Sequence, residues 1–425
     1  MRALTALQRA MFSIAVLITT AFLLRSAASI EFSGLGKCAA PLDSPPRQFA
    51  NDAASVSALQ TPSPVSAPPA FAFLTIGDWG CECGCAPRQT AAHYGCSIAL
   101  KERAVAEKTA ALLHRLSNRT AASSASNSSL PPTVEFVISV GDHFYDVGAR
   151  NVNDPRFQCG WADLFYDSAT GRTRQNSSAS PPPPWYLVLG NHDYGGDLQA
   201  QIDYSRVHAG WNMPARYFSR KWVLPPVSTS NGSTNATTLT PTLRVLFLDT
   251  MHLCGDRHVH QRGEAADVQW NWLGAALAAS RADFLFVVGH HPVFSGGPIH
   301  GNNRCLQQRL RPLLEAHGAH YLSGHEHALQ HLSSGGVSYF VSGTACRVDS
   351  KHVPPRLAPR IAETRYASFE HGLLRHSFGA CNSSHTPQQS QQRARACMTV
   401  EFIKAEGDVV VHSTVVPARV LAMRV

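Results

Sequence analysis

A glycine followed by a metal-binding type of side chain occurs five times in the sequence, each time after an apolar run. Carboxylate, amide and imidazole groups are the ligands that hard and borderline cations take in proteins. Any one of these segments could be a turn or a solvated side chain, but their shared placement indicates one metal site. The segments are Gly77-Asp78-Trp79-Gly80, Gly141-Asp142-His143-Phe144-Tyr145, Gly190-Asn191-His192-Asp193, Gly289-His290-His291-Pro292 and Gly324-His325-Glu326-His327.

The number of donors favours two metal ions over one. The set exceeds what a single catalytic ion with open positions takes, and it suits two ions about 3.5–4 Å apart that share a carboxylate. Asp142 is the natural bridge because its motif lies centrally among the others. The donors are Asp78, Asp142, Asn191, His290, His325 and His327.

Tyr145 lies three positions beyond Asp142 and is an unusual neighbour for a divalent site. A phenol with a pKa of about 10 gives up its proton only to a strongly acidic cation. Tyr145 could therefore reach one ion and mark it as Fe³⁺. Residue chemistry alone leaves a second interpretation open, in which Tyr145 is a core aromatic or a hydrogen-bond donor.

The elements that must position these groups alternate along the chain. Apolar runs predict strands at 71–76, 134–140, 185–189, 243–248, 284–288 and 321–323. Helical spacing predicts helices at 98–116, around Trp270–Leu277 and at 306–316. This order of strand, polar motif and helix predicts an α/β fold with the active groups at one edge of the sheets. The turn Glu406-Gly407-Asp408 predicts a closing hairpin at 396–416.

The N-terminus is typical of an exported protein. Arg2 and Arg9 precede a 14-residue apolar run that ends at Leu24 and is followed by Arg25 and small residues. A spanning helix needs about 17–25 residues, so we expect a cleaved signal peptide over 1–29, with an uncleaved anchor as the alternative. Residues 30–70 are rich in Ala, Ser and Pro and indicate a linker before a domain at 71–425.

Cysteine content and glycosylation motifs agree with the secretory pathway, either secreted or in a lysosomal or vacuolar lumen. The chain has 11 cysteines, many for a reducing compartment. The net charge of +8 is scattered rather than gathered in a basic stripe, which argues against a nucleic-acid partner. No stable membrane partner is expected unless the signal is an uncleaved anchor. The N-glycosylation motifs are at Asn118, Asn127, Asn176, Asn231, Asn235 and Asn382.

The five motifs in this order, together with Tyr145, resemble the metallophosphoesterases, and among them the purple acid phosphatases of the small mammalian, tartrate-resistant type. The resemblance runs from about Phe71 to Gly343 and again through the C-terminal hairpin. It implies a four-layer αββα sandwich, in which helices flank two mixed β-sheets. It also implies an acid phosphatase that hydrolyses phosphate monoesters through a metal-bound hydroxide at an Fe(III)–M(II) centre.

The resemblance assigns roles to individual residues. The ferric site would comprise Asp78, Asp142, Tyr145 and His327. The divalent site, for Fe²⁺, Zn²⁺ or Mn²⁺, would comprise Asp142, Asn191, His290 and His325.

Two further histidines match catalytic positions of the family. His192 would bind the substrate phosphate and help to protonate the leaving group, and Asp193 is expected to orient it. His300 resembles the second catalytic histidine, although its spacing from His290 is one residue longer than the family pattern. The family's disulfide would correspond to Cys254–Cys305, which would tie down the loop that carries His300.

Two segments depart from the pattern. The cluster Cys81-Glu82-Cys83-Gly84-Cys85, with Cys96, suits a zinc site or disulfides, and an exported context favours disulfides. The segment Gly343-Thr344-Ala345-Cys346 also differs from the family. Two other functions stay open: a metallophosphodiesterase or nucleotidase on the same scaffold, and a secreted iron-carrying glycoprotein with incidental activity.

Overall fold

The computed structural model describes residues 71–81, 100–117, 133–166, 182–229, 237–255, 265–297, 299–348, 362–381 and 396–419. All of these lie in the compact unit Pro64–Val425. The expected signal peptide at 1–29, the linker at 30–70 and the six glycosylation motifs lie outside the described residues, so they stay predictions.

The first seven-stranded sheet carries the two predicted aspartates. Its order is β16-β15-β14-β1-β2-β3-β4. Strands β1 to β4 run parallel, whereas β14, β15 and β16 pair antiparallel on the other side of β1. The bounds are β1 (Phe71–Ile76), β2 (Thr133–Ser139), β3 (Trp185–Leu187), β4 (Trp211–Asn212), β14 (Gly372–Ala380), β15 (Ala396–Lys404) and β16 (Val409–Pro417).

The second seven-stranded sheet carries the predicted histidine ligands. Its order is β13-β11-β12-β10-β9-β8-β5, with β8, β9, β10 and β12 parallel. A separate two-stranded hairpin joins β6 (Val227–Thr229) and β7 (Thr237–Leu239). The bounds are β5 (Phe218–Val223), β8 (Thr242–Phe247), β9 (Phe284–Val288), β10 (His320–Ser323), β11 (Leu329–Ser334), β12 (Val337–Ser342) and β13 (Glu363–Ser368).

Alternating side chains on the central strands build the layers. On β9, Phe286 packs in a core cluster with residues of both sheets, whereas Leu285 and Val287 pack with helix residues. Because successive strand side chains point to opposite faces, each sheet has one face toward the other sheet and one toward helices. Helices α5 (Ala266–Ala278) and α6 (Arg304–His317) cover one side.

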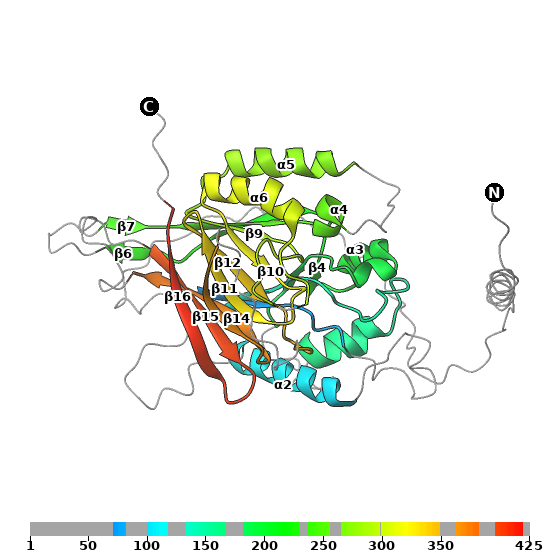
Figure 1. The fold of residues 1–425 in the computed structure, drawn as a ribbon. Coiled ribbons are helices and arrows are strands. Elements are labelled where there is room, and N and C mark those ends of the chain that lie inside the picture. The colour runs from blue at the N-terminus through cyan, green and yellow to red at the C-terminus, as the bar shows by residue number, and fades with distance from the viewer. Residues whose placement is uncertain are drawn as a thin grey trace, which may run out of the picture. The chain divides into compact units, whose positions relative to one another are not determined.

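Helix α2 (Leu100–Ser117) and a π-helix (Phe157–Tyr166) cover the first sheet on its outer face. Figure 1 shows α5 and α6 above the sheets and α2 below them. The four-layer arrangement of two mixed sheets between helices confirms the predicted fold class.

The C-terminal hairpin forms as predicted, but the sequence did not reveal its neighbour in the sheet. Strands β15 and β16 pair with each other, and β14 lies between β15 and β1. The residues of β14 include His376, whose ring is fully buried and stacks on Phe73 with ring centroids 4.2 Å apart. Its Nε2 lies 3.0 Å from the hydroxyl of Thr75. Strand β14 is therefore an interior strand that carries a buried imidazole, bonded through Nε2 to Thr75.

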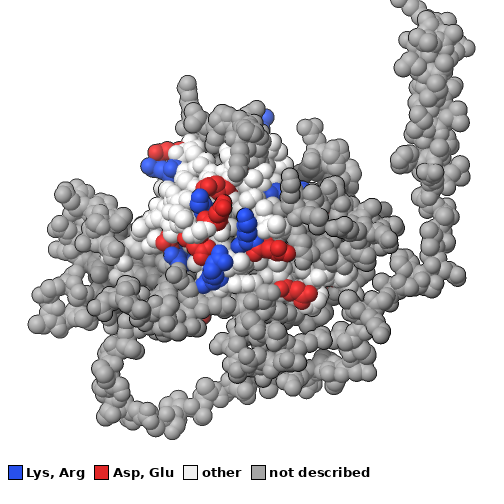
Figure 2. Space-filling view, turned by 90° about the horizontal axis from the view of Figure 1, so that it is seen from below, with Lys and Arg blue, Asp and Glu red and all other residues white. Residues whose placement is uncertain are grey.

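The surface around α2 carries charges of both signs. Seen from this side in Figure 2, the described Lys and Arg side chains lie next to Asp and Glu rather than in a patch of one sign. One ion pair joins α2 to the β15–β16 turn, with Arg115 Nε 2.7 Å from Asp408 Oδ2. Among the described helices, none combines the length and apolar character needed to cross a bilayer.

Candidate metal centre

The carboxylates of Asp78 and Asp142 meet because the backbone turns sharply after β1 and β2. Both residues have left-handed backbone conformations, with φ of 57° and 55°. The two turns bond to each other: Asp78 N donates to Gly141 O at 3.1 Å and Gly80 N donates to Asp142 O at 3.2 Å. Such backbone costs about 1–3 kcal/mol per residue and is typical of functional sites.

One group of donors gathers around the hydroxyl of Tyr145. This oxygen lies 3.1 Å from Asp78 Oδ1, 3.0 Å from Asp142 Oδ2 and 3.2 Å from His327 Nε2. His327 Nε2 is also 3.6 Å from Asp78 Oδ1. The structure thus brings together the four side chains expected at the ferric site.

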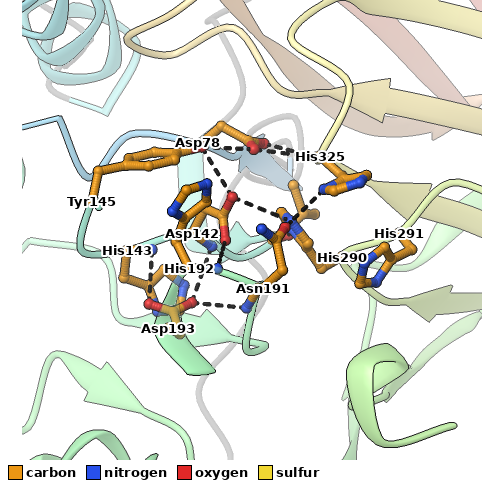
Figure 3. A network of polar contacts seen from close by, with 12 residues as sticks. Asp78, Asp142, His143, Tyr145, Asn191, His192, Asp193, His290, His291 and His325 are labelled. Carbon is orange, nitrogen blue, oxygen red and sulfur yellow. Dashed lines mark hydrogen bonds and ion pairs between the residues drawn. The ribbon is translucent and has the colours of Figure 1, made fainter. Parts of the chain in front are cut away.

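A second group gathers around the side-chain oxygen of Asn191. Asn191 Oδ1 lies 2.9 Å from His290 Nε2 and 2.8 Å from His325 Nδ1. His290 Nε2 is 3.3 Å from Asp142 Oδ2. Asp142, His290 and His325 present ligand atoms that all lie within 4.8 Å of one another. Figure 3 shows the side chains converging, with Asp142 shared by both groups.

Main-chain contacts orient His290 toward this point. Its Nδ1 donates to Val140 O at 2.8 Å, which leaves Nε2 to face Asn191 and Asp142. A hydrogen bond of this kind is the usual way in which a protein fixes the tautomer of a ligating histidine. The hydroxyl of Thr250 accepts from the backbone N–H of both His290 and His291, at 3.2 Å and 3.1 Å. Sequence reasoning missed the role of Thr250, which starts helix α4 (Thr250–Cys254).

Burial dominates the electrostatics of the site. Burial raises the pKa of Asp78, and it also opposes ionisation of Asp142. Burial is the largest single effect at Asp142, but the charge and hydrogen bond of His290, together with His192 and His325, outweigh it and leave the pKa of that carboxyl below its usual range. In return, Asp142 raises the pKa of His290 to about 9 against the effect of burial. Burial and the two nearby carboxylates raise the pKa of the Tyr145 phenol well above 10.

Both predicted catalytic histidines border the donors. The ring of His192 lies over Tyr145, with centroids 4.3 Å apart, and its Nδ1 donates to Asp146 O at 2.8 Å. The ring of His300 lies beside that of His325, with centroids 3.9 Å apart and the planes tilted by 33°. The longer spacing before His300 therefore does not carry it away from the site.

The expectation that Asp193 orients the ring of His192 is wrong. The carboxylate of Asp193 accepts instead from the backbone N–H of Asp142, His143 and Gly190, at 3.1, 3.1 and 2.8 Å. It is fully buried, and Gln201 Nε2 donates to it at 2.9 Å. The three N–H groups fix the direction of the Asp193 side chain. Asp193 therefore stabilises the turn at Asp142 and does not orient the imidazole of His192.

A buried arginine that sequence reasoning missed holds the next turn. Arg156 donates to the carbonyls of Tyr145 and Gly148, at 3.3 and 2.6 Å, and pairs with Asp154 at 2.8 Å. Its side chain is 3% exposed, so this ion pair is shielded from solvent. Arg156 therefore holds the loop that carries Tyr145, and no sequence motif singled it out.

Disulfides frame the site on two sides. The Cys254–Cys305 bond expected from the resemblance is present, with an S–S distance of 2.01 Å. Cys81 pairs with Cys346, which lies 265 residues away, so Cys81 is engaged in a disulfide rather than in a zinc site. Cys83, Cys85 and Cys96 lie outside the described residues. A third bond, Cys381–Cys397, joins the end of β14 to β15.

The Cys81–Cys346 disulfide brings Arg347 to the metal centre. The Arg347 guanidinium carbon lies 4.6 Å from the centre of the Tyr145 ring, and its Nη2 lies 3.5 Å from Asp146 Oδ1. The side chain is 21% exposed. The only sequence signal for this arrangement is the departure of residues 343–346 from the family pattern.

Comparison with known proteins identifies the family. The profile of the calcineurin-like phosphoesterases matches residues 71–329. Human tartrate-resistant acid phosphatase type 5 is 32% identical over 355 residues, which cover 80% of this chain and 89% of the relative. The chain is a calcineurin-like phosphoesterase of the purple acid phosphatase type. Purple acid phosphatase 7 of Arabidopsis thaliana is 34% identical over 228 residues, 52% of this chain and 63% of the relative.

Membership of the purple acid phosphatases confirms the resemblance seen in the motifs. It makes the chain a hydrolase of phosphate esters and associates it with a binuclear metal centre. Among solved structures, GAP50, the anchor in the inner membrane complex of Plasmodium, superposes with a TM-score of 0.57 at 18% identity. The superposition covers 83% of this chain and 90% of the GAP50 chain, and this similarity supports the fold.

Proposed function

We propose that this purple acid phosphatase hydrolyses phosphate monoesters at an Fe³⁺–M²⁺ centre. The observation that carries the proposal is the position of the Tyr145 hydroxyl, within 3.2 Å of two carboxylates and an imidazole. A buried phenol with a raised pKa is a poor ligand for a divalent ion, whereas Fe³⁺ is acidic enough to ionise it.

The donor chemistry fits two cations. Fe³⁺ would be held by Asp78, Asp142, Tyr145 and His327, and the divalent ion, Fe²⁺, Zn²⁺ or Mn²⁺, by Asp142, Asn191, His290 and His325. Bound together, the two ions would supply positive charge for the phosphate oxygens and would acidify water to act as the nucleophile.

Two histidines of the chain would bind the substrate phosphate and donate a proton to the leaving group. Since His192 Nδ1 donates to Asp146 O, His192 Nε2 is the atom left to meet a phosphate or leaving-group oxygen. His300, beside His325, supplies a second imidazole at the same rim. A positioned histidine acid typically accelerates such a step by about 10²–10⁴-fold. Asp78, Asp142 and His290 are buried, so the site restricts access of bulk water.

We further propose that the enzyme works in the secretory pathway, either secreted or in an acidic lumen. The disulfides Cys81–Cys346, Cys254–Cys305 and Cys381–Cys397 support this, because such bonds persist in oxidising compartments.

The test is to purify the full chain from a secreting host and measure its metals, its visible spectrum and its hydrolysis rates. We expect bound iron, a visible absorption band, and a kcat/KM at least tenfold higher for p-nitrophenyl phosphate than for bis(p-nitrophenyl) phosphate. A preference for the diester would establish the phosphodiesterase alternative instead. Bound iron with no turnover above that of Asp142→Asn would establish an iron-carrying protein.

A further inference from the structure

Glu326 lies between two predicted ligands in the sequence, yet its carboxylate serves a different segment. Oε1 accepts from the backbone N–H of Ile299 at 3.1 Å, and Oε2 accepts from those of His300 and Gly301 at 3.0 and 2.9 Å. The side chain is fully buried. A buried carboxylate is costly unless several donors satisfy it, and here three consecutive amides of one loop do so.

The loop is shaped to close on this carboxylate. A Cβ at Gly297 would collide with the Glu326 side chain, so only glycine allows the approach. Upstream, Gln330 Oε1 accepts from Gly296 N at 2.7 Å, and Asn302 Oδ1 accepts from Ser295 N at 2.9 Å. These bonds hold the two ends of the turn, whereas the side chain of Glu326 bonds to the amides at 299–301 between them.

The amide that Glu326 binds at the centre of this turn belongs to His300. The His300 ring lies 3.9 Å from His325 and 6.4 Å from His327, measured between centroids. Residues 325–327 thus present two imidazoles to the metal centre and a carboxylate to the loop that carries His300. This also accounts for how a loop one residue longer than the family pattern still delivers its histidine.

We propose that Glu326 is a positioning residue that holds His300 against the metal centre. The proposal rests on the proposed function, because His300 is a predicted catalytic group. Glu326 does not touch substrate in this scheme; it acts only through the three amides, so its removal should matter only while His300 is present.

The first measurement does not depend on catalysis. Hydrogen–deuterium exchange of the peptide that contains residues 299–301 is compared in the wild type and in Glu326→Gln. The amide variant replaces one acceptor oxygen with an N–H₂ group, and we expect exchange at these positions to rise at least tenfold. Glu315→Gln is the matched control, because Glu315 on α6 accepts from Ser334 Oγ of β11 at 2.8 Å and shows no bond to residues 299–301 in the described part of the chain. Unchanged exchange in Glu326→Gln would overturn the proposal.

The second measurement is a double-mutant cycle with phosphate monoester substrates. We expect His300→Ala to lower kcat/KM about 100-fold and Glu326→Gln about tenfold, with the double variant within twofold of His300→Ala. Multiplicative losses would show that Glu326 acts independently of His300 and would overturn the proposal.

Gly297→Ala is a second way to separate the Glu326 carboxylate from the amides at 299–301, and it leaves residues 325–327 unchanged. We expect it to raise hydrogen exchange at 299–301 and to lower kcat/KM only while His300 is present. This test remains available if Glu326→Gln folds poorly. A wild-type protein without phosphatase activity, but with the expected change in exchange, would refute the proposed function and leave the positioning by Glu326 in place.

Discussion

The hydroxyl of Tyr145 lies 3.0 Å from Oδ2 of Asp142, a residue only three positions before it. Side chains this close in sequence converge because the backbone reverses at Asp142, with φ of 55°, while Arg156 holds the carbonyl of Tyr145 from the other side. The same hydroxyl lies 3.1 Å from Asp78, on the neighbouring strand end. This position of a phenol between two carboxylates is the arrangement on which the proposed ferric site rests.

Tyr145→Phe should abolish the visible absorption of the iron-loaded protein while leaving it folded. The reason is that absorption of this kind requires a phenolate on Fe³⁺, and burial keeps the phenol protonated unless such a cation is bound. Tyr194→Phe is the matched control, because Tyr194 donates to Asp249 at 2.6 Å and belongs to neither group of donors. The measurement is a visible spectrum at matched iron content, and retained colour in Tyr145→Phe would refute the ferric assignment.

Arg347→Ala should move the visible band to longer wavelength. Charge transfer from phenolate to iron removes an electron from the tyrosine, and the guanidinium 4.6 Å from the ring makes that removal harder. Loss of the cation should lower the transition energy by about 1–2 kcal/mol, the scale of a partly desolvated cation–π contact. Arg347→Lys keeps the charge and should shift the band less. A band that is unmoved, or moved to shorter wavelength, in Arg347→Ala contradicts this.

Metal content should separate the shared ligand from the unshared one. Asp142 lies within 3.3 Å of ligand atoms of both groups, whereas the side chain of Asn191 bonds to His290 and His325 of the second group. We expect Asp142→Asn to lose both ions and Asn191→Ala to lose mainly the divalent ion, each with at least a 100-fold fall in kcat. Elemental analysis of the purified variants checks this, and loss of iron from Asn191→Ala alone would exclude the proposed division of ligands.

Acid should destabilise the inter-sheet core through His376. Burial lowers the pKa of this imidazole to about 3, whereas an unfolded histidine titrates near 6.5. As the pH falls below 6.5, His376 binds a proton in the unfolded chain but stays neutral in the folded chain. Stability present above that pH is therefore lost toward pH 3, at up to about 1.4 kcal/mol per pH unit.

His376→Leu should remove this part of the pH dependence, at a cost at neutral pH because Thr75 loses its partner. Urea unfolding at pH 7 and pH 5 measures both effects. His317→Leu serves as the control, since the His317 side chain is partly exposed at the end of α6. An identical slope in His376→Leu and wild type would show that this ring is not the source.

The sequence predicted the strands and the donors because both depend on local pattern. An apolar run that ends in glycine and a polar residue specifies a strand and its carboxyl end, and parallel strands bring those ends to one edge. For this reason Asp78, Asn191 and His290 lie where they were expected. The assignment of each to a particular ion stays a prediction.

The supporting contacts could not be predicted because they depend on which distant segments the fold places side by side. Glu326 looks like a spacer between two histidines, and only the closed loop reveals that it binds three amides. Cys81 seemed to belong to the adjacent cysteine cluster, but its partner is Cys346. Because Asp193 follows His192 in the sequence, we predicted that it orients the His192 ring, but its carboxylate bonds to the backbone of the Asp142 turn.

The insertion of β14 between β1 and the C-terminal hairpin bears on how the enzyme matures. Strand β1, whose end carries Asp78, obtains its second neighbour only from residues that follow it by about 300 positions, as in the contact of Thr75 with His376. Pairing between such distant segments is slow, because the intervening loop must close first. The sheet beneath the metal centre is therefore complete only after β14 has been synthesised. Metal loading that depends on the finished sheet should therefore follow the synthesis of residues 372–380.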